Sequence, residues 1–201
     1  MDITTINIYN QEAESIAKLH ASLTPNRIYE LINQYFIKHK STADIGCGIG
    51  RDVNWLHNNG FPSIGIDASE GMLKQARALY PNIDFQMDYL PQLASLAHST
   101  FQNILCSAVL MHLDNRDVEL ACLRLLQLLN NDGSLIISIR GTNEPTKREN
   151  NKLYESINIE SFNQFFQKNG CEILLYENEV EKNRGLTWHN FVIRKLQSLV
   201  L

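Results

Sequence analysis

The amino-acid sequence predicts an α/β fold, in which a largely parallel sheet is covered by helices on both faces. Two observations carry this prediction. Five short apolar segments alternate with helical patterns between residues 41 and 139 of the 201-residue chain, as expected for successive strand–helix units. The first segment runs directly into a glycine-rich turn, Gly-Cys-Gly-Ile-Gly at 46–50, and a helical pattern follows that turn.

Composition and charge narrow the class of protein. The chain is 44% hydrophobic and 20% charged, with a formal net charge of -4, which is ordinary for one soluble domain over 1–201 and gives no positive surplus for nucleic acid. No apolar run approaches the ~20 residues that span a bilayer. The four cysteines are scattered, and no residue cluster has metal-ligand spacing. We therefore expect a cytoplasmic protein, monomeric or homodimeric, with no membrane partner, no nucleic-acid partner and no metal.

Two helices are predicted before the first strand, within residues 1–40. In residues 10–21, apolar side chains recur at helical spacing on one face. Thr24 and Pro25 predict the start of the second helix, with threonine as the N-cap and proline at the first helical position. The apolar stripe of this second helix consists of Ile28, Leu31, Ile32, Tyr35 and Phe36.

The remaining elements follow in order. Strands are predicted at 41–47, 64–67, 83–88, 101–109 and 135–139. Helices are predicted after the glycine turn, after Ser69, at 91–98, and from Asp114 or Asn115 to a turn at 130–133. Beyond a polar segment at 141–158, which is predicted to be a loop, come a helix at 159–169 and strands at 172–176 and 188–195, joined by a charged loop at 177–187.

The glycine turn has an acid two residues ahead of it. Asp44 precedes Gly46, Gly48 and Gly50, and Arg51 breaks the G-x-G-x-x-G spacing that is typical of dinucleotide sites. A carboxylate beside bare backbone suits a ligand with a positive end, such as an amino acid or a sulfonium. The pattern of an acid, one residue and then G-x-G-x-G resembles motif I of the class I S-adenosylmethionine-dependent methyltransferases.

That resemblance covers nearly the whole chain and implies a specific architecture. It implies a Rossmann-like three-layer α/β/α sandwich, whose seven-stranded and mostly parallel sheet has the strand order 3-2-1-4-5-7-6 with the last strand antiparallel. The closing strands at 172–176 and 188–195 fit this arrangement. In this family, helices ahead of the first strand often cover the ligand, so Tyr9 and Arg27 are candidates to reach it; the alternative is that both face solvent.

Two more acids fall at the ends of predicted strands, where ligands bind in open α/β sheets. Asp67 follows Gly50 by 17 residues, and its carboxylate can accept hydrogen bonds from both hydroxyls of a ribose. The alternative is that Asp67 is a helix N-cap, but Ser69 can already serve as the N-cap. Asp88, 21 residues further on, matches the acid that accepts from the adenine amine in this family. Met72 either packs on the purine or belongs to the core. The predicted cofactor-binding residues are Asp44, Gly46, Cys47, Gly48, Gly50, Arg51, Asp67, Ala68, Met72, Asp88, Tyr89 and Ser107.

A histidine follows the fourth predicted strand, in the region matching motif IV, where cofactor and acceptor meet in this family. Many small-molecule members carry a histidine that matches His112. We predict a catalytic role as general base, with an ordinary pKa near 6.5; the alternative is that His112 only shapes the pocket or bonds to nearby backbone. The Asn/Asp-Pro-Pro-Tyr/Phe sequence of the family's N-methylating enzymes is missing here, which counts against DNA bases or glutamine as acceptors. His189 is predicted to be structural.

The polar segment 141–158 leaves the carboxyl end of a predicted strand, so it lies above the proposed active site. We expect a lid over the acceptor; the alternative is a solvated flexible loop. The residues that would recognise an anionic or polar acceptor there are Arg140, Asn143, Arg148 and Tyr154.

The resemblance implies an S-adenosylmethionine-dependent methyltransferase that transfers a methyl group to a small-molecule acceptor and releases S-adenosylhomocysteine. Three alternatives stay open. The protein could bind this cofactor without transferring anything, it could be a nucleotide-dependent oxidoreductase, or it could methylate protein or RNA. The negative net charge counts against the last of these.

Overall fold

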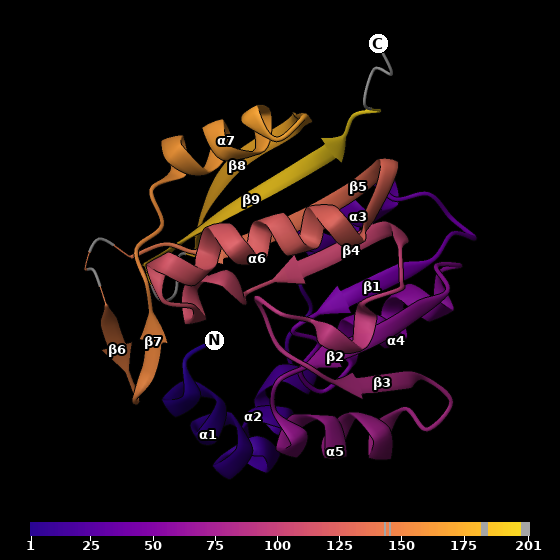
Figure 1. Ribbon diagram of the computed structural model, residues 1–201. Helices are drawn as coiled ribbons and strands as arrows, with labels where there is room; N and C mark the ends of the chain where they lie inside the picture. Colours follow the sequence, from indigo (N-terminus) through magenta and orange to yellow (C-terminus); the bar gives the residue numbers. More distant parts are fainter. Residues whose placement is uncertain (143, 145, 182–184, 198–201) are drawn as a thin grey trace.

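Seven strands form the main sheet of the computed structural model, which describes residues 1–142, 144, 146–181 and 185–197 (Figure 1). They are β1 (Thr42–Ile45), β2 (Ser63–Asp67), β3 (Asp84–Met87), β4 (Phe101–Ser107), β5 (Leu129–Arg140), β8 (Cys171–Glu181) and β9 (Leu186–Lys195). Their order is β3-β2-β1-β4-β5-β9-β8, and β9 runs antiparallel to both of its neighbours. Because β8 and β9 are the sixth and seventh strands of this sheet along the chain, the predicted order 3-2-1-4-5-7-6 is confirmed.

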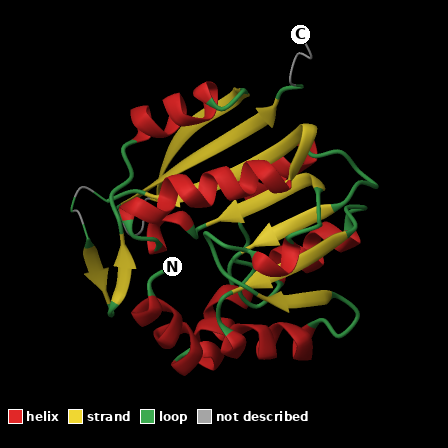
Figure 2. Cartoon of the chain, in the orientation of Figure 1, coloured by secondary structure: helices red, strands yellow, loops and turns green. Residues whose placement is uncertain are grey.

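Helices cover both faces of the sheet, as predicted (Figure 2). One face carries α3 (Asn26–Tyr35), α4 (Arg51–Asn58) and α5 (Glu70–Leu79), and the other carries α6 (Asn115–Leu128) and α7 (Ile159–Lys168). The central strand β4 packs against the helices on both faces of the sheet. Leu105 packs with the α3 side chains, while Ile104 and Cys106 pack with those of α6. A strand buried on both faces is apolar without alternation, which is why its pattern was readable in the sequence.

Two helices, α1 (Ile3–Gln11) and α2 (Ala13–Ala21), lie at the carboxyl-end edge of the sheet, where they contact α5 and a short hairpin (Figure 1). The sequence predicted one helix at 10–21, whereas the structure has two, and the first of them begins at Ile3. Thr5 is the buried residue of α1, so this helix has no apolar stripe that a sequence pattern could reveal. The buried face of α2 contains Ala13 and Ile16, as predicted.

The segment predicted as a loop at 141–158 contains a β-hairpin. Strand β6 (Lys147–Glu149) pairs antiparallel with β7 (Lys152–Tyr154), and the hairpin stands apart from the main sheet (Figure 1). The prediction was wrong because strands of three residues are too short to show an alternating pattern. Asn143, a predicted lid residue, lies outside the described residues.

Four boundaries also differ from the predictions. Strand β8 lies at the edge of the sheet, where exposed polar side chains are tolerated, and β8 and its partner β9 extend into the charged loop predicted at 177–187. Pro25 takes the N-cap position of α3 that was predicted for Thr24. The helix predicted at 91–98 is reduced to a 3-10 turn, η1 (Ala94–Leu96). β5 already begins at Leu129, which pairs with Phe101 of β4, and the next pair is Asn103 with Ser134. The predicted turn at 130–133 lies in the register shift between these two pairs. Within the described ranges, every helix is too short or too polar to cross a lipid bilayer.

Candidate functional site

The turn between β1 and α4 has a backbone that requires glycine. Gly46, Gly48 and Gly50 adopt φ angles of 81, 54 and 76°, in the left-handed region that residues with a Cβ rarely adopt. At Gly46, a Cβ would lie 2.1 Å from Cγ2 of Val109, two residues beyond β4. The carboxyl ends of β1 and β4 can therefore approach each other this closely only with bare backbone at Gly46.

A buried carboxylate lies just ahead of the turn, on β1. Asp44 is 2% exposed, and its Oδ2 has no hydrogen-bond partner among the residues that the structure describes. Burial raises the pKa of Asp44 well above its usual range; Asp52 and Asp67 add to this effect, while Arg51 opposes it. Since an unpaired buried carboxylate oxygen is costly, this atom marks a place for a positively charged ligand group.

Asp67 ends β2 beside the same turn. Its Oδ2 accepts a hydrogen bond from the backbone N–H of Gly48 at 2.7 Å, and its Oδ1 accepts one from that of Ser69 at 2.8 Å. Burial raises the pKa of Asp67, and these backbone donors partly offset that effect. A carboxylate offers about four lone-pair positions, so the two that remain are available for hydroxyl groups of a ligand.

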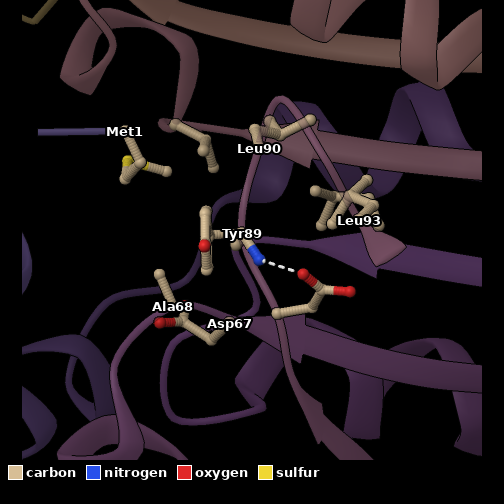
Figure 3. A pocket seen from close by; sticks show the side chains of 10 residues that line it. Met1, Asp67, Ala68, Tyr89, Leu90 and Leu93 are labelled. Carbon is tan, nitrogen blue, oxygen red and sulfur yellow. Dashed lines mark hydrogen bonds between the residues drawn. The ribbon is translucent and has the colours of Figure 1, made fainter. Parts of the chain in front are cut away.

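A small pocket opens beside Asp67, where about 200 Å³ of empty space includes open solvent (Figure 3). It brings together five predicted cofactor residues: Gly46, Asp67, Ala68, Asp88 and Tyr89. The lining residues that were not predicted are Met1, Ile45, Leu90, Leu93 and Val109. The second set is apolar, so part of the wall suits a flat, uncharged ring system. The one feature of the sequence that could have indicated Leu90 and Leu93 is that they follow the predicted cofactor residue Asp88 within five residues.

Asp88 organises the loop that carries these two leucines. Its Oδ1 accepts from the N–H of Tyr89 at 2.8 Å, and its Oδ2 accepts from the N–H and hydroxyl of Ser95 at 2.7 and 2.6 Å. From α6, Arg124 donates to the carbonyl of Leu93 at 2.9 Å. The loop is thereby fixed from two sides. A contact between Asp88 and an adenine amine stays a prediction.

Besides Asp44, Gly48 and Gly50, four predicted residues do not line this pocket. Arg51 pairs with Asp52 at 2.8 Å and donates to two backbone carbonyls at the end of α2, so it ties α2 to the start of α4. Met72 and Cys47 are buried in two separate apolar clusters. Ser107 ends β4, where it pairs with β5. Direct contact of these four with a cofactor stays a prediction.

His112 is buried in the 3-10 turn η2 (Leu110–His112), shortly after β4. Its Nδ1 lies 2.6 Å from the carbonyl oxygen of Leu153, and the Tyr9 hydroxyl lies 3.3 Å from Nε2. A carbonyl can only accept, so Nδ1 carries the proton and Nε2 accepts from Tyr9. Burial lowers the pKa of His112 to about 4, which keeps the imidazole neutral at pH 7.

Five side chains from α1, η2, β5 and β7 gather here, and we call them the histidine cluster: Tyr9, His112, Arg140, Lys152 and Tyr154. The rings of Tyr9 and Tyr154 meet the imidazole edge-on, with centroid distances of 5.8 and 5.0 Å. The guanidinium carbon of Arg140 lies 4.2 Å from the centroid of the Tyr154 ring. Nζ of Lys152 lies 5.0 Å from the centroid of the Tyr9 ring. Segments far apart in the sequence thus build one polar and aromatic cluster.

Three other predicted residues have partners elsewhere. Arg27 pairs with Glu177 of β8 at 2.7 Å, so it joins α3 to the sheet edge and stays out of the histidine cluster. Arg148 pairs with Asp2 at 2.9 Å, which joins the hairpin to the start of α1. His189 is hydrogen-bonded to β8 at 3.1 Å, in keeping with the structural role that was predicted.

Comparison with known proteins agrees with this arrangement. A family model described as Methyltransferase domain matches residues 43–133, from β1 into β5. A curated protein of Geobacillus sp. (strain WCH70) that is named as a methyltransferase is 29% identical over 107 residues, which cover 51% of this chain and 43% of that protein. Another, from Invertebrate iridescent virus 6, is 30% identical over 87 residues, which cover 42% of this chain and 32% of that protein. The matched part spans less than half the length of either relative.

Solved structures share the fold over most of the chain. The 1,6-didemethyltoxoflavin-N1-methyltransferase of Burkholderia thailandensis, solved with 1,6-didemethyltoxoflavin and S-adenosylhomocysteine, has a TM-score of 0.78 at 15% identity, covering 96% of this chain and 88% of that one. An S-adenosylmethionine-dependent methyltransferase of Clostridium acetobutylicum has a TM-score of 0.72 at 14% identity, covering 94% and 99%. Residues 43–133 therefore match the model of a methyltransferase domain, and the chain shares its fold with solved S-adenosylmethionine-dependent methyltransferases.

Proposed function

We propose that this protein is an S-adenosylmethionine-dependent methyltransferase that acts on a small-molecule acceptor, and that residues 1–201 form one catalytic domain. The observation that carries the proposal is the unpaired, buried Oδ2 of Asp44 beside the glycine turn. An ammonium group would give this oxygen a partner at the place where the motif I resemblance expects the methionine end of the cofactor. The family match over 43–133 and the S-adenosylhomocysteine bound in the Burkholderia neighbour support the same cofactor.

The described residues fit this cofactor. Asp44 pairs with the ammonium group, and Asp67 uses its remaining lone pairs for the two ribose hydroxyls. The adenine packs against Leu90 and Leu93, next to Asp88. When bound, S-adenosylmethionine supplies a methyl group on a positively charged sulfur, which an acceptor atom can attack.

On the other side of the site, His112 holds the acceptor. Its contact with the Tyr9 hydroxyl is long, at 3.3 Å, and an O–H or N–H of the acceptor can replace it. As the acceptor atom takes the methyl group, its proton leaves towards Nε2 or water. An imidazole with a pKa of about 4 is a weak base, so His112 contributes mainly by orienting the acceptor.

The helix α1 and the hairpin β6–β7 together cover the acceptor. Arg148 donates to Asp2 at 2.9 Å, and the N–H of Leu153 donates to the hydroxyl of Thr5 at 2.9 Å. These contacts join parts of the two segments expected to cover the site, 1–40 and 141–158. Such a cover keeps water away from the reacting atoms. The four cysteines are free and buried, which supports the expected cytoplasmic location.

Calorimetry with S-adenosylhomocysteine and with NAD tests the cofactor. We expect S-adenosylhomocysteine to bind with micromolar or tighter affinity and NAD not to bind. Incubation with S-adenosylmethionine and a panel of small-molecule acceptors should then yield S-adenosylhomocysteine and methylated product, detected by mass spectrometry. Binding of NAD alone would indicate an oxidoreductase. Cofactor binding without any methylated small molecule, protein or RNA would indicate a binding protein.

A further inference from the structure

Arg140 stands at the carboxyl end of β5 with an unused hydrogen-bond donor. Its side chain is 11% exposed, and its Nη2 lies 2.7 Å from the carboxylate of Glu149. Its Nε is buried and has no hydrogen-bond partner within the described part of the chain. The guanidinium also stacks over the ring of Tyr154. Arg140 is therefore held in place by two neighbours, while its buried Nε–H has no acceptor among the described residues.

Among the described arginines, Arg140 is the one whose Nε is both buried and without a partner. The Nε groups of Arg27, Arg51 and Arg124 each donate to a carboxylate or a carbonyl, at 2.7, 2.8 and 2.9 Å respectively. An arginine is charged at all accessible pH values, so a buried N–H without an acceptor is a persistent cost. The free Nε of Arg140 is thus best explained by an acceptor atom that a ligand supplies.

The position of Arg140 connects this donor to the proposed active site. Tyr154 contacts both Arg140 and His112, with its ring 4.2 Å from the guanidinium carbon and 5.0 Å from the imidazole centroid. A second cation, Lys152, has a side chain that is 14% exposed, and its counter-ion Glu12 is 3.5 Å away and 46% exposed. A ligand group near His112 thus meets two cations that are only partly neutralised.

The electrostatic effect on His112 agrees with this geometry. Burial is the main cause of its lowered pKa, and both Lys152 and Arg140 lower the pKa further, whereas Asp2 raises it. Two cations and one anion therefore act on the imidazole from neighbouring elements. An acceptor with a negative charge gains attraction at this position, while a cationic acceptor is repelled.

We propose that Arg140 binds an oxyanion of the methyl acceptor, so that the acceptor is a small organic acid bearing a carboxylate or a phosphate. The anion accepts from Nε–H of Arg140, and the nucleophilic atom of the same molecule lies at Nε2 of His112. The aromatic rings of Tyr9 and Tyr154 suit an acid with a flat ring. This inference rests on the proposed function and deepens it.

Three probes of similar shape test the inference on the protein saturated with S-adenosylhomocysteine: benzoate, phenyl phosphate and the neutral benzamide. We expect at least one anion to bind about tenfold or more tightly than benzamide, the effect of one charge-assisted hydrogen bond, as measured by calorimetry. The anion that binds better identifies a carboxylic or a phosphoric acid. Arg140→Met, which keeps the length of the side chain and removes its charge, should abolish the preference for the anion.

Arg116→Met is the matched control, because Arg116 also pairs with a carboxylate but is 89% exposed on α6. It should keep the preference of the wild type. If Arg140→Met does not fold, Arg140→Lys tests the same donor, since it retains the charge but has no Nε–H; the preference should fall several-fold. The inference is overturned if neither anion binds more tightly than benzamide, or if the preference survives in both Arg140 variants. If the anion preference is absent but S-adenosylhomocysteine still binds, only the inference about Arg140 fails and the proposed function stands. If the wild-type protein does not bind S-adenosylhomocysteine, the proposed function itself is contradicted.

Discussion

Replacing Asp44 by Asn should stabilise the cofactor-free protein and weaken cofactor binding at the same time. The substitution keeps the shape of the side chain and removes its charge. In the free protein the carboxylate is buried near Asp52 and Asp67, so its ionised form is unfavourable. The amide has no such charge. We therefore expect a higher free energy of unfolding for Asp44→Asn at pH 7.

The pH dependence of this gain has a definite sign. The pKa of Asp44 is raised above its value of 3.8 in the unfolded chain, so the unfolded state releases its proton first as the pH increases. Wild-type stability therefore decreases as the pH rises from 3.8 through the folded-state pKa. Asp44→Asn has no carboxyl group at this position and so does not lose stability in this way. The difference in free energy of unfolding between Asp44→Asn and the wild type should therefore be small at acidic pH and grow towards neutral pH.

Cofactor binding should change in the opposite direction. With Asp44 only 2% exposed, water competes little with the proposed ammonium–carboxylate pair. Removing one charge from such a pair costs about 2–3 kcal/mol, which weakens binding of S-adenosylhomocysteine by about 30- to 150-fold. The apparent stabilisation and the loss of affinity share one cause, the unpaired Oδ2.

Urea denaturation at several pH values gives the stability, and calorimetry with S-adenosylhomocysteine gives the affinity. Asp84→Asn serves as a control, because Asp84 is an exposed carboxylate on β3 and its replacement should change neither quantity appreciably. The reasoning would be refuted if Asp44→Asn were less stable than the wild type and bound S-adenosylhomocysteine equally well. Asp44 would then stabilise the fold through a partner within the protein and would not bind the cofactor.

Three further predictions concern Asp67 and His112. Asp67→Ala should weaken binding of S-adenosylhomocysteine by about 1–3 kcal/mol, because ribose hydroxyls and the N–H groups of Gly48 and Ser69 lose their acceptor; calorimetry that finds equal affinity would contradict the ribose assignment. His112→Ala should slow methyl transfer with nearly unchanged cofactor affinity, and equal rates would exclude a role in holding the acceptor. Because burial lowers the pKa of His112 from 6.5 to about 4, the unfolded chain binds one more proton between those values. Wild-type stability should thus fall by up to about 3 kcal/mol as the pH drops from 6.5 to 4, and most of this loss should be missing in His112→Gln, as measured by urea denaturation.

The sheet and the glycine turn could be predicted because each depends on a local pattern. The part of β4 that is buried on both faces, 104–106, is apolar without alternation, and the turn at 46–50 needs glycine for its backbone angles. Asp67 and Asp88 were found because parallel strands bring their carboxyl ends to one edge of the sheet, and both line the pocket.

The remaining features depend on contacts between distant segments. Thr5 is the buried residue of α1, and the hairpin strands have three residues each, so neither segment has a readable period. Arg140 and Tyr154 were predicted to recognise an anionic or polar acceptor, but the contacts of Tyr154 with Arg140 and with His112 follow from the fold alone. Arg51 shows the opposite case, because it adjoins the glycine turn in sequence while its side chain pairs with Asp52 and reaches the end of α2.

Val109 links the two halves of the site. Its side chain lies over Gly46, and its carbonyl accepts from the N–H of His112 at 2.9 Å. The backbone at His112 is therefore tied to the residue that packs on the glycine turn, so the turn and the histidine cluster are held in a fixed relation. The segments α1 and β7 are joined to each other by the contact between Thr5 and Leu153, and both also contact His112, through Tyr9 and through the carbonyl of Leu153. Under the proposed function, the side chains of these two segments are therefore the first to vary when a different acceptor is wanted, with the position of His112 checked in each variant.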